Sequence, residues 1–207
     1  MTAEIALLPG LHVSRETEAR LRAFTALVLK WTATINLIAV ADHGQLWQRH
    51  VLDSAQLVLV APARIVRWAD LGSGGGFPGI VVAALLAEFN PGARMSLVES
   101  DQRKATFLRQ AARLLGLSLD VITARAETTA PLQADVLTAR ALAKLTDLMP
   151  LAERHLATGG TALFPKGRTS NNEIAAARAH WAFDLQQTPS MTDASATILG
   201  LQRITRA

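Results

Sequence analysis

Apolar side chains follow a helical period along the first part of the chain. Between residues 14 and 35 they recur every three or four positions, which predicts an amphipathic helix with Ser14 as its N-cap. The apolar positions are Leu21, Phe24, Leu27, Val28, Trp31 and Ile35. After a polar loop near Asp42, a second helical stretch covers roughly 46–59 and ends before Pro62. We expect these two helices to form an N-terminal cap.

From residue 65 the pattern changes to short β-rich runs that alternate with helical ones. The predicted strands cover 65–71, 94–99, 119–123, 135–139 and 161–164, and the predicted helices cover 80–88, 102–115 and 146–156. Turn residues support this division. Asn90-Pro91-Gly92 ends the first helix, Gly116 is placed as the left-handed C-cap of the second, and Gly159-Gly160 predicts a turn before the last strand. Such alternation predicts βαβ units and a parallel sheet.

The last part of the chain predicts a helix over 172–180 and two strands, near 183–187 and 197–205. We expect this strand pair to close the sheet as an antiparallel edge. The predicted fold class is therefore α/β, with a mostly parallel sheet, an antiparallel C-terminal edge and an N-terminal helical cap. Because the 207 residues contain no repeat or linker, we expect one domain over 1–207, with a cap at 1–62 and a core at 63–207.

Composition excludes several classes of function. The chain has no cysteine, which removes disulfides, thiolate nucleophiles, iron–sulfur clusters and cysteine-ligated zinc, and we predict no metal site. The longest apolar runs, 57–63 and 80–87, are shorter than the roughly 20 residues that span a membrane. The N-terminus shows no signal-peptide pattern. We therefore expect a cytoplasmic protein without a membrane partner.

The charge balance suggests a polyanionic partner. The net charge is +4, and 17 of the 21 cations are arginines, whose planar guanidinium groups suit phosphates and guanine edges. Codon usage in an alanine- and arginine-rich chain explains the same composition. Composition by itself therefore leaves both interpretations open.

The first predicted strand of the sheet runs directly into a glycine-rich loop. Residues 70–79 read Asp-Leu-Gly-Ser-Gly-Gly-Gly-Phe-Pro-Gly, with five glycines in the eight residues from Gly72 to Gly79. Glycines let the backbone approach a ligand closely, and the helix that follows offers unpaired N–H groups at its N-terminus. A phosphate-binding Walker loop is excluded because no Lys-Ser or Lys-Thr follows the last glycine.

Two interpretations of the glycine loop remain. The dinucleotide pattern G-x-G-x-x-G is present at Gly74, Gly76 and Gly79, but it starts late relative to the strand and contains Pro78. A dehydrogenase would also need a separate substrate domain, for which the chain has no room. The other interpretation takes the whole string from Asp70 to Gly76, which resembles the first motif of Rossmann-like methyltransferases that use S-adenosylmethionine.

Two further strand ends fit such a ligand. Glu99 ends the second strand of the series, where a carboxylate can accept hydrogen bonds from ribose hydroxyls; a solvated strand cap is the alternative role. The loop after the third strand contains Arg125, Ala126 and Glu127, which would flank an adenine. One ligand would then lie across three successive strand ends.

Three cations also follow predicted strands: Arg125 the third, Arg140 the fourth and Lys166 the fifth. In an open α/β sheet this edge binds ligands, and together these groups suit an RNA phosphate or the O6 and N7 acceptors of guanine. Methylation at cytosine C5 is excluded because it needs a thiolate. The segment 138–141 lacks the Pro-Pro-aromatic motif of adenine-amine methylases. Guanine N7 has an in-plane lone pair and needs no strong base, so positioning would supply most of the catalysis.

With these residues, the chain resembles the RsmG (GidB) family, bacterial 16S rRNA guanine-N7 methyltransferases, most clearly from Lys30 to Gly167. The elements that carry the resemblance are Lys30-Trp31, Asn36-Leu37, Arg49-His50-Val51-Leu52-Asp53-Ser54, the glycine loop with Ile80, Phe107-Leu108-Arg109-Gln110, Arg140-Ala141 and Lys166-Gly167. The string around His50 separates this family from other methyltransferases. Three positions depart from the family pattern: Ile38, Glu99 and Pro165.

The resemblance implies a Rossmann-like class I methyltransferase sheet. It also implies methyl transfer from S-adenosyl-L-methionine, with S-adenosyl-L-homocysteine as product, to N7 of one guanine in the decoding-region loop of 16S rRNA. The RNA would be part of the small ribosomal subunit or of an assembly intermediate. By motif position, the cofactor residues would be Gly72, Gly74, Gly76, Phe77, Glu99, Ala126, Glu127 and Arg140. The target side would be formed by Asn36, Arg49, His50, Asp53, Arg125 and Lys166.

Our own assignment gives a catalytic group of Asn36, Arg125, Arg140 and Lys166. Arg140 and Lys166 would hold phosphate or guanine O6, and Asn36 would orient the base.

Three residues near this site have two possible roles. For His50 and Asp53 we favour structural hydrogen bonds that pack the cap on the sheet over an acid–base or metal pair. For Trp31 we favour a place in the core over a stacking platform for a flipped base. We expect a monomer. Two alternative functions stay open: a methyltransferase acting on another RNA or a small molecule, and a non-catalytic RNA-binding Rossmann protein.

Overall fold

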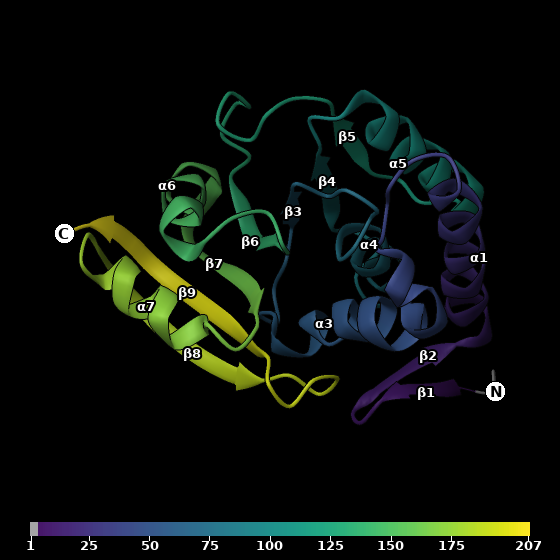
Figure 1. Cartoon of the computed structure of the whole chain (residues 1–207), viewed down its shortest axis with the longest axis horizontal. Helices are drawn as coiled ribbons and strands as arrows, with labels where there is room; N and C mark the ends of the chain where they lie inside the picture. Colours follow the sequence, from purple (N-terminus) through teal and green to yellow (C-terminus); the bar gives the residue numbers. More distant parts are fainter. Residues whose placement is uncertain (1–3) are drawn as a thin grey trace.

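The chain forms one seven-stranded sheet with helices on both faces and a cap built from its N-terminal part (Figure 1). The computed structural model describes residues 4–207, so the first three residues of the predicted cap lie outside the described residues. Among residues 4–207, every helix is too short or too polar to span a bilayer.

The sheet has the strand order β5-β4-β3-β6-β7-β9-β8. The strands are β3 (Arg67–Leu71), β4 (Arg94–Val98), β5 (Asp120–Ile122), β6 (Ala134–Ala139), β7 (Leu156–Lys166), β8 (Trp181–Pro189) and β9 (Thr197–Arg206). β3 to β7 are parallel, whereas β9 is antiparallel to both β7 and β8. The predicted α/β fold with an antiparallel C-terminal edge is therefore confirmed. The chain order reverses between β3 and β6, which places a topological switch point there.

Helices cover both faces of this sheet. α1 (Arg15–Thr32), α4 (Gly79–Phe89) and α5 (Gln102–Leu115) share one hydrophobic core, and α6 (Leu145–His155) and α7 (Ser170–Arg178) share the other. Successive strand residues alternate between the two cores: Trp68 and Val136 belong to the first, Ala69 and Leu137 to the second. Because side chains alternate across a strand, burial on both faces requires the continuous apolar runs seen in the sequence.

The predicted helix caps are confirmed. The Ser14 hydroxyl accepts a hydrogen bond from the Thr17 N–H at 3.2 Å, at the start of α1. Gly116 ends α5 with φ +64°, the left-handed conformation that glycine adopts without a Cβ penalty. Local sequence signals therefore fixed the start of α1 and the end of α5.

The cap contains a β-hairpin that the sequence analysis missed. β1 (Glu4–Leu8) and β2 (Leu11–Ser14) pair antiparallel around Pro9-Gly10, a turn signal in which Gly10 has φ +80°. Leu8, Leu11 and Val13 are buried in the first core. The expectation of a purely helical cap is wrong because two strands this short show almost no periodicity of their own.

The second predicted helix, 46–59, is irregular. It is built from the wider π-helical η2 (Trp47–Leu52) and the short helices α2 (Asp53–Ala55) and α3 (Leu57–Val60), and the 3₁₀-helical η1 (Val40–Gln45) precedes it. Near the wide turn of η2, the Arg49 carbonyl accepts a hydrogen bond at 3.3 Å from Arg140 of the sheet edge. Local irregularity of this type often marks functional sites.

The predicted Gly159-Gly160 turn is part of β7 rather than a break before it. β7 begins at Leu156, which pairs with Ala134, and the register then shifts so that Thr161 pairs with Val136. Extra residues of β7 bulge out at this shift, and Gly159 has φ +79°. The two glycines therefore mark a bulge within the strand.

We expect the Phe24→Ala substitution to lower the free energy of unfolding by about 3–5 kcal/mol, because it removes a fully buried ring from the first core. The Phe24 ring lies 5.0 Å from the Phe77 ring and 6.3 Å from the Phe107 ring, between centroids. Urea denaturation measures the effect. Leu29→Ala on the same helix, where the side chain is 42% exposed, is the control. Equal losses in the two variants would contradict this packing.

Candidate active site

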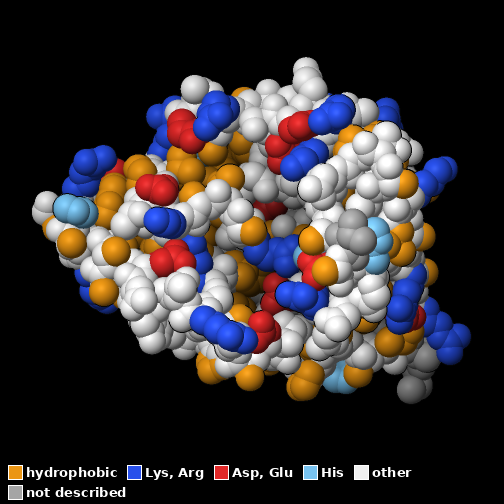
Figure 2. All heavy atoms as spheres, in the orientation of Figure 1, with side chains coloured by type: hydrophobic (Ala, Val, Ile, Leu, Met, Phe, Trp, Pro, Cys, Tyr) orange, Lys and Arg blue, Asp and Glu red, His pale blue; other side chains and the backbone are white. Residues whose placement is uncertain are grey.

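Two cavities open at the carboxyl ends of the parallel strands, where an open α/β sheet binds its ligands. The larger, about 850 Å³, lies between η2, the ends of β6 and β7 and the β8–β9 loop. The smaller, about 340 Å³, lies across the ends of β3, β4 and β5. Leu142 and Ala143 line both, so one loop separates them. Figure 2 shows the molecule hollowed on this face, with Lys, Arg, Asp and Glu side chains around the hollow.

The glycine loop forms one side of the smaller cavity. Gly72 has φ +65°, a conformation that favours glycine, and a Cβ on it would lie 2.6 Å from Leu142 Cδ1, so the Leu142 side chain packs directly on its backbone. Gly74 and Gly76 also have positive φ, +51° and +84°. Of this loop, Gly72 lines the cavity and presents bare backbone to it.

Glu99 lies between Val98 and Ser100, two residues that line the smaller cavity. Its side-chain oxygens accept hydrogen bonds from the Gly74 N–H and the Asp101 N–H, each at 2.8 Å. The residue is only 7% exposed, so it is no solvated strand cap. Each carboxylate oxygen has a second lone pair, which leaves Glu99 able to accept hydrogen bonds from a ligand.

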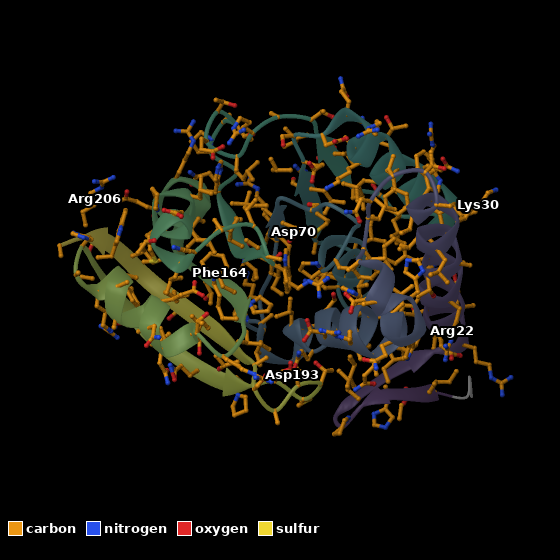
Figure 3. The ribbon with its side chains drawn as sticks, in the orientation of Figure 1. Arg22, Lys30, Asp70, Phe164, Asp193 and Arg206 are labelled. Carbon is orange, nitrogen blue, oxygen red and sulfur yellow. The ribbon has the colours of Figure 1, made fainter. Side chains whose placement is uncertain are left out.

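Asp70 is a fully buried carboxylate at the end of β3, and Figure 3 shows it near the middle of the molecule. Burial raises its pKa to about 6, opposed by a hydrogen bond from the Thr138 hydroxyl to Oδ1 at 2.8 Å. Its Oδ2 has no hydrogen-bond partner among the described residues. A Cβ on Gly79 would lie 2.8 Å from this oxygen, so the start of α4 packs directly on Asp70.

One side of the smaller cavity is formed by the loop after β5. Arg125, Ala126 and Glu127 line it, as predicted for Ala126 and Glu127. Arg125, predicted both in this loop and on the target side, lines this cavity and forms an exposed ion pair with Glu127 at 3.5 Å. The last residues of α6 anchor the loop, because Arg154 donates to the Thr129 carbonyl and His155 donates to the Ala126 carbonyl at 2.9 Å.

Arg140 connects the cap to the sheet at the larger cavity. Its Nη2 donates a hydrogen bond to His50 Nδ1 at 2.6 Å, and its Nη1 lies 3.4 Å from Asp53 Oδ2. His50 and Asp53 thus both contact Arg140. These contacts agree with the role predicted for the two residues, which is to pack the cap on the sheet. Arg140 lines the larger cavity rather than the smaller one.

The contacts of His50 assign its protonation. Because Arg140 donates to Nδ1, the proton lies on Nε2, which is 3.3 Å from Asp42 Oδ2. Burial and the Arg140 charge lower the pKa of His50, although Asp42 opposes this shift. The ring is therefore a neutral structural link at physiological pH.

Phe77 packs beneath this network. Its ring centroid lies 5.1 Å from that of His50 and 5.7 Å from the Arg140 guanidinium carbon. The predicted cofactor residue Phe77 is thus placed at the junction of the glycine loop, the cap and the sheet edge.

Lys166 lies at the other side of the larger cavity. Its ammonium donates hydrogen bonds to Glu173 Oε2 and to the Ala143 carbonyl, both at 2.8 Å. Lys166 is therefore bound to protein groups rather than free to reach solvent, although it lines the cavity as predicted.

Asn36 and Trp31 are not among the residues that line either cavity. Asn36 is exposed in the loop after α1, next to Leu37, whose carbonyl oxygen lies 2.7 Å from where a Cβ on Gly75 would be. Trp31 packs edge-on against Phe107, with centroids 5.7 Å apart, so the predicted core role is confirmed.

Comparison with known proteins identifies the family. A family model described as rRNA small subunit methyltransferase G (GidB) matches residues 17–200. The chain belongs to this family. A relative named ribosomal RNA small subunit methyltransferase G, from Cereibacter sphaeroides, is 54% identical over 93% of both chains. Another with that name, from Ruegeria pomeroyi, is 48% identical over 95% of this chain and 96% of its own.

Solved structures of low identity share the fold. A predicted O-methyltransferase from Agrobacterium tumefaciens superposes with a TM-score of 0.57 and 23% identity, over 72% of this chain and 79% of its own. A mutant of MtNAS in complex with S-adenosylmethionine superposes with a TM-score of 0.58 and 18% identity, over 90% and 76%. The expected family, the methyltransferase fold and the activity on small-subunit rRNA are thus confirmed.

The sequence analysis of this methyltransferase G family member missed several residues of the site. Asp42 pairs with Arg49 at 2.7 Å as well as with His50. Thr192, in the β8–β9 loop, donates a hydrogen bond to Asp53 at 2.9 Å, and Figure 3 shows its neighbour Asp193 in the same loop. Glu173 pairs with Lys166 from α7. None of these residues stands at a strand end, so no pattern along the chain pointed to them.

Asp70 makes the stability of this family member depend on pH. Because burial raises its folded pKa to about 6, its contribution to stability is present at low pH and is lost as the pH rises through about 6. Between about pH 5 and about pH 8, we expect the free energy of unfolding of the wild-type protein to fall by about 1 kcal/mol through this group. Asp70→Asn should not show this fall. Urea denaturation of both proteins at the two pH values measures this. The exposed Asp120→Asn is the control. A wild-type-to-variant difference that is the same at both pH values would contradict the prediction.

Proposed function

We propose that this protein transfers a methyl group from S-adenosyl-L-methionine to N7 of one guanine in the decoding-region loop of 16S rRNA. The observation that carries the proposal is the pair of cavities that share the wall of Leu142 and Ala143. One suits a nucleoside held by a carboxylate and bare backbone, and the other suits a base among cations. In a member of this family, these are the methyl donor and its target.

The smaller cavity is assigned to the donor. Its volume and its position at the switch point suit a nucleoside-sized ligand. Glu99 would accept hydrogen bonds from the ribose hydroxyls, the bare backbone of Gly72 would lie against the ligand, and Ala126 and Glu127 would flank the adenine. When bound, the donor supplies a methyl group activated by a positively charged sulfur.

The larger cavity is assigned to the guanine and its phosphate. Arg140 is one of its cations, and its guanidinium is held by contacts to His50, Asp53 and the Arg49 carbonyl. A guanidinium fixed in this way can donate to guanine O6 or to phosphate. Asn36 and Arg125 lie outside this cavity, so they serve the target only if RNA extends over the rim.

Four cations and four carboxylates line the larger cavity. The cations are Arg49, Arg140, Lys144 and Lys166, and the carboxylates are Asp42, Asp53, Glu173 and Asp193. The guanine N7 would use its lone pair to accept the methyl group from the donor sulfur, and one positive charge would pass from the sulfur to the guanine. A site with balanced charges can accommodate this cationic product. No proton is removed, which fits a neutral His50 that serves as a link and not as a base.

Catalysis by this chain is therefore mainly positioning. Holding two reactants in line contributes more than about 7 kcal/mol in well-oriented systems. Three parts of the chain position the reactants: the residues that hold the base, the wall of Leu142 and Ala143, and the glycine loop.

The substrate class sets the further context. We propose that one chain, a single domain over 1–207, acts as a monomer because it contributes both cavities by itself. Its RNA is 16S rRNA in the small ribosomal subunit or in an assembly intermediate, which places the enzyme in the cytoplasm.

The decisive experiment measures transfer of labelled methyl from S-adenosylmethionine to small ribosomal subunits from a host that lacks this enzyme. We expect 7-methylguanosine at a single site of 16S rRNA, identified by the mass of the nucleoside. Free 16S rRNA and a pool of other RNAs are assayed in parallel. Labelling of only the other RNAs would show a different target, and binding of the donor without any transfer would indicate a non-catalytic protein.

Glu99→Gln tests the donor site. We expect its affinity for S-adenosylmethionine to fall about 10- to 100-fold, because the charged acceptor of the ribose hydroxyls is lost. Calorimetric titration without RNA measures this affinity, and RNA affinity should change little. Glu153→Gln, an exposed carboxylate on α6, is the matched control. Wild-type donor affinity in Glu99→Gln would remove Glu99 from the site.

A further inference from the structure

The wall between the two cavities is a short backbone segment, residues 141–143. Leu142 rests on Gly72 of the glycine loop, and Leu142 and Ala143 face both cavities. Ala141 has φ +53°, which is unfavourable for a residue with a Cβ. Such a conformation persists only where the surroundings enforce it. The wall therefore needs an anchor outside itself.

Lys166 and Glu173 provide this anchor. Lys166 Nζ donates to the Ala143 carbonyl at 2.8 Å and to Glu173 Oε2 at 2.8 Å. The same Glu173 oxygen accepts a hydrogen bond from the Leu145 N–H at 2.8 Å. One ion pair thus fixes the backbone on both sides of Lys144, where the wall ends and α6 begins.

The pair is an internal structure rather than two surface charges. The Lys166 and Glu173 side chains are only 10% and 19% exposed. Burial acts to raise the pKa of Glu173, but hydrogen bonds from Lys166 and the Leu145 N–H outweigh it and lower this pKa. Two of the three ammonium hydrogens of Lys166 bind protein acceptors, and the Thr169 hydroxyl donates to the other Glu173 oxygen at 3.2 Å.

We propose that Lys166 and Glu173 form a positioning pair that holds the 141–143 wall, and thereby sets the separation of methyl donor and guanine. The inference rests on the function proposed above. Lys166 then acts on the reaction through the wall, and not by holding a phosphate or guanine O6 as the sequence analysis assigned. Glu173 becomes equally important, because it binds both Lys166 and the Leu145 N–H.

The geometry of transfer explains why such a pair matters. Transfer is in line, from sulfur to the guanine N7, so a displacement of about 1 Å costs roughly 100-fold in rate. A wall that faces both cavities controls the position of both reactants. Loosening it should therefore affect donor binding and turnover together.

The first test measures donor affinity without RNA in Lys166→Met, Glu173→Gln and the double variant. We expect each single variant to bind S-adenosylmethionine at least about 5-fold more weakly, and the double variant to be no weaker than the weaker single one. Glu16→Gln, which removes the exposed ion pair with Arg20 on α1, is the control. Unchanged donor affinity in both single variants would overturn the proposal.

The second test measures kcat and KM for small ribosomal subunits in the same proteins. We expect kcat to fall at least about 10-fold in each single variant, with little change in KM and in its salt dependence. If Lys166 held RNA directly, Lys166→Met alone would raise KM and flatten the salt dependence, whereas Glu173→Gln would do neither. Effects that multiply in the double variant would also overturn the proposal.

Circular dichroism and thermal melting establish that each variant is folded. Where a neutral variant does not fold, Lys166→Arg and Glu173→Asp keep both charges but change the reach of the pair, and the same non-additive loss of donor affinity is expected. If the wild-type protein methylates no ribosomal RNA, the proposed function fails. The donor affinities of the variants, measured without RNA, still decide whether the pair positions the wall.

Discussion

One half-buried guanidinium holds the functional half of the molecule together. Arg140 extends from the end of β6 into the cap, where it contacts His50 at 2.6 Å and Asp53 at 3.4 Å, and it lies 5.7 Å from the Phe77 ring. A cation out of water is costly unless hydrogen-bond acceptors surround it. The cap can therefore dock on the sheet only where its acceptors meet this group. That requirement also fixes one wall of the larger cavity.

The second constraint is steric and lies in the glycine loop. The loop passes between Asp70 and α4 with hardly any space for side chains. The Leu142 side chain packs where a Cβ of Gly72 would lie, and the start of α4 packs on Asp70. Bare backbone therefore faces the smaller cavity. Together, Arg140 and the glycine loop place a donor site and a base site on opposite sides of one thin wall. A reaction that needs no proton transfer can be catalysed by this arrangement alone.

Most of the fold could be predicted from the sequence because its signals are local. Burial on both sheet faces produces apolar runs, and Ser14 and Gly116 cap helices through neighbours in the chain. The prediction failed where local signals were weak or ambiguous. The first hairpin is too short to show a period, and the Gly159-Gly160 pair fits a turn as well as the bulge that β7 contains.

By itself, the sequence determined the parts of the site that belong to a strand and the turn after it: the glycine loop, Glu99 and the cations Arg140 and Lys166. A strand end carries its next residues to the ligand edge whatever lies around it. Only the tertiary structure decided what those cations bind. Asp53 meets Arg140 across 87 positions of the chain, and Glu173 reaches Lys166 from a separate helix. These partners depend on how distant elements pack and on where their side chains point, and no spacing along the chain encodes either.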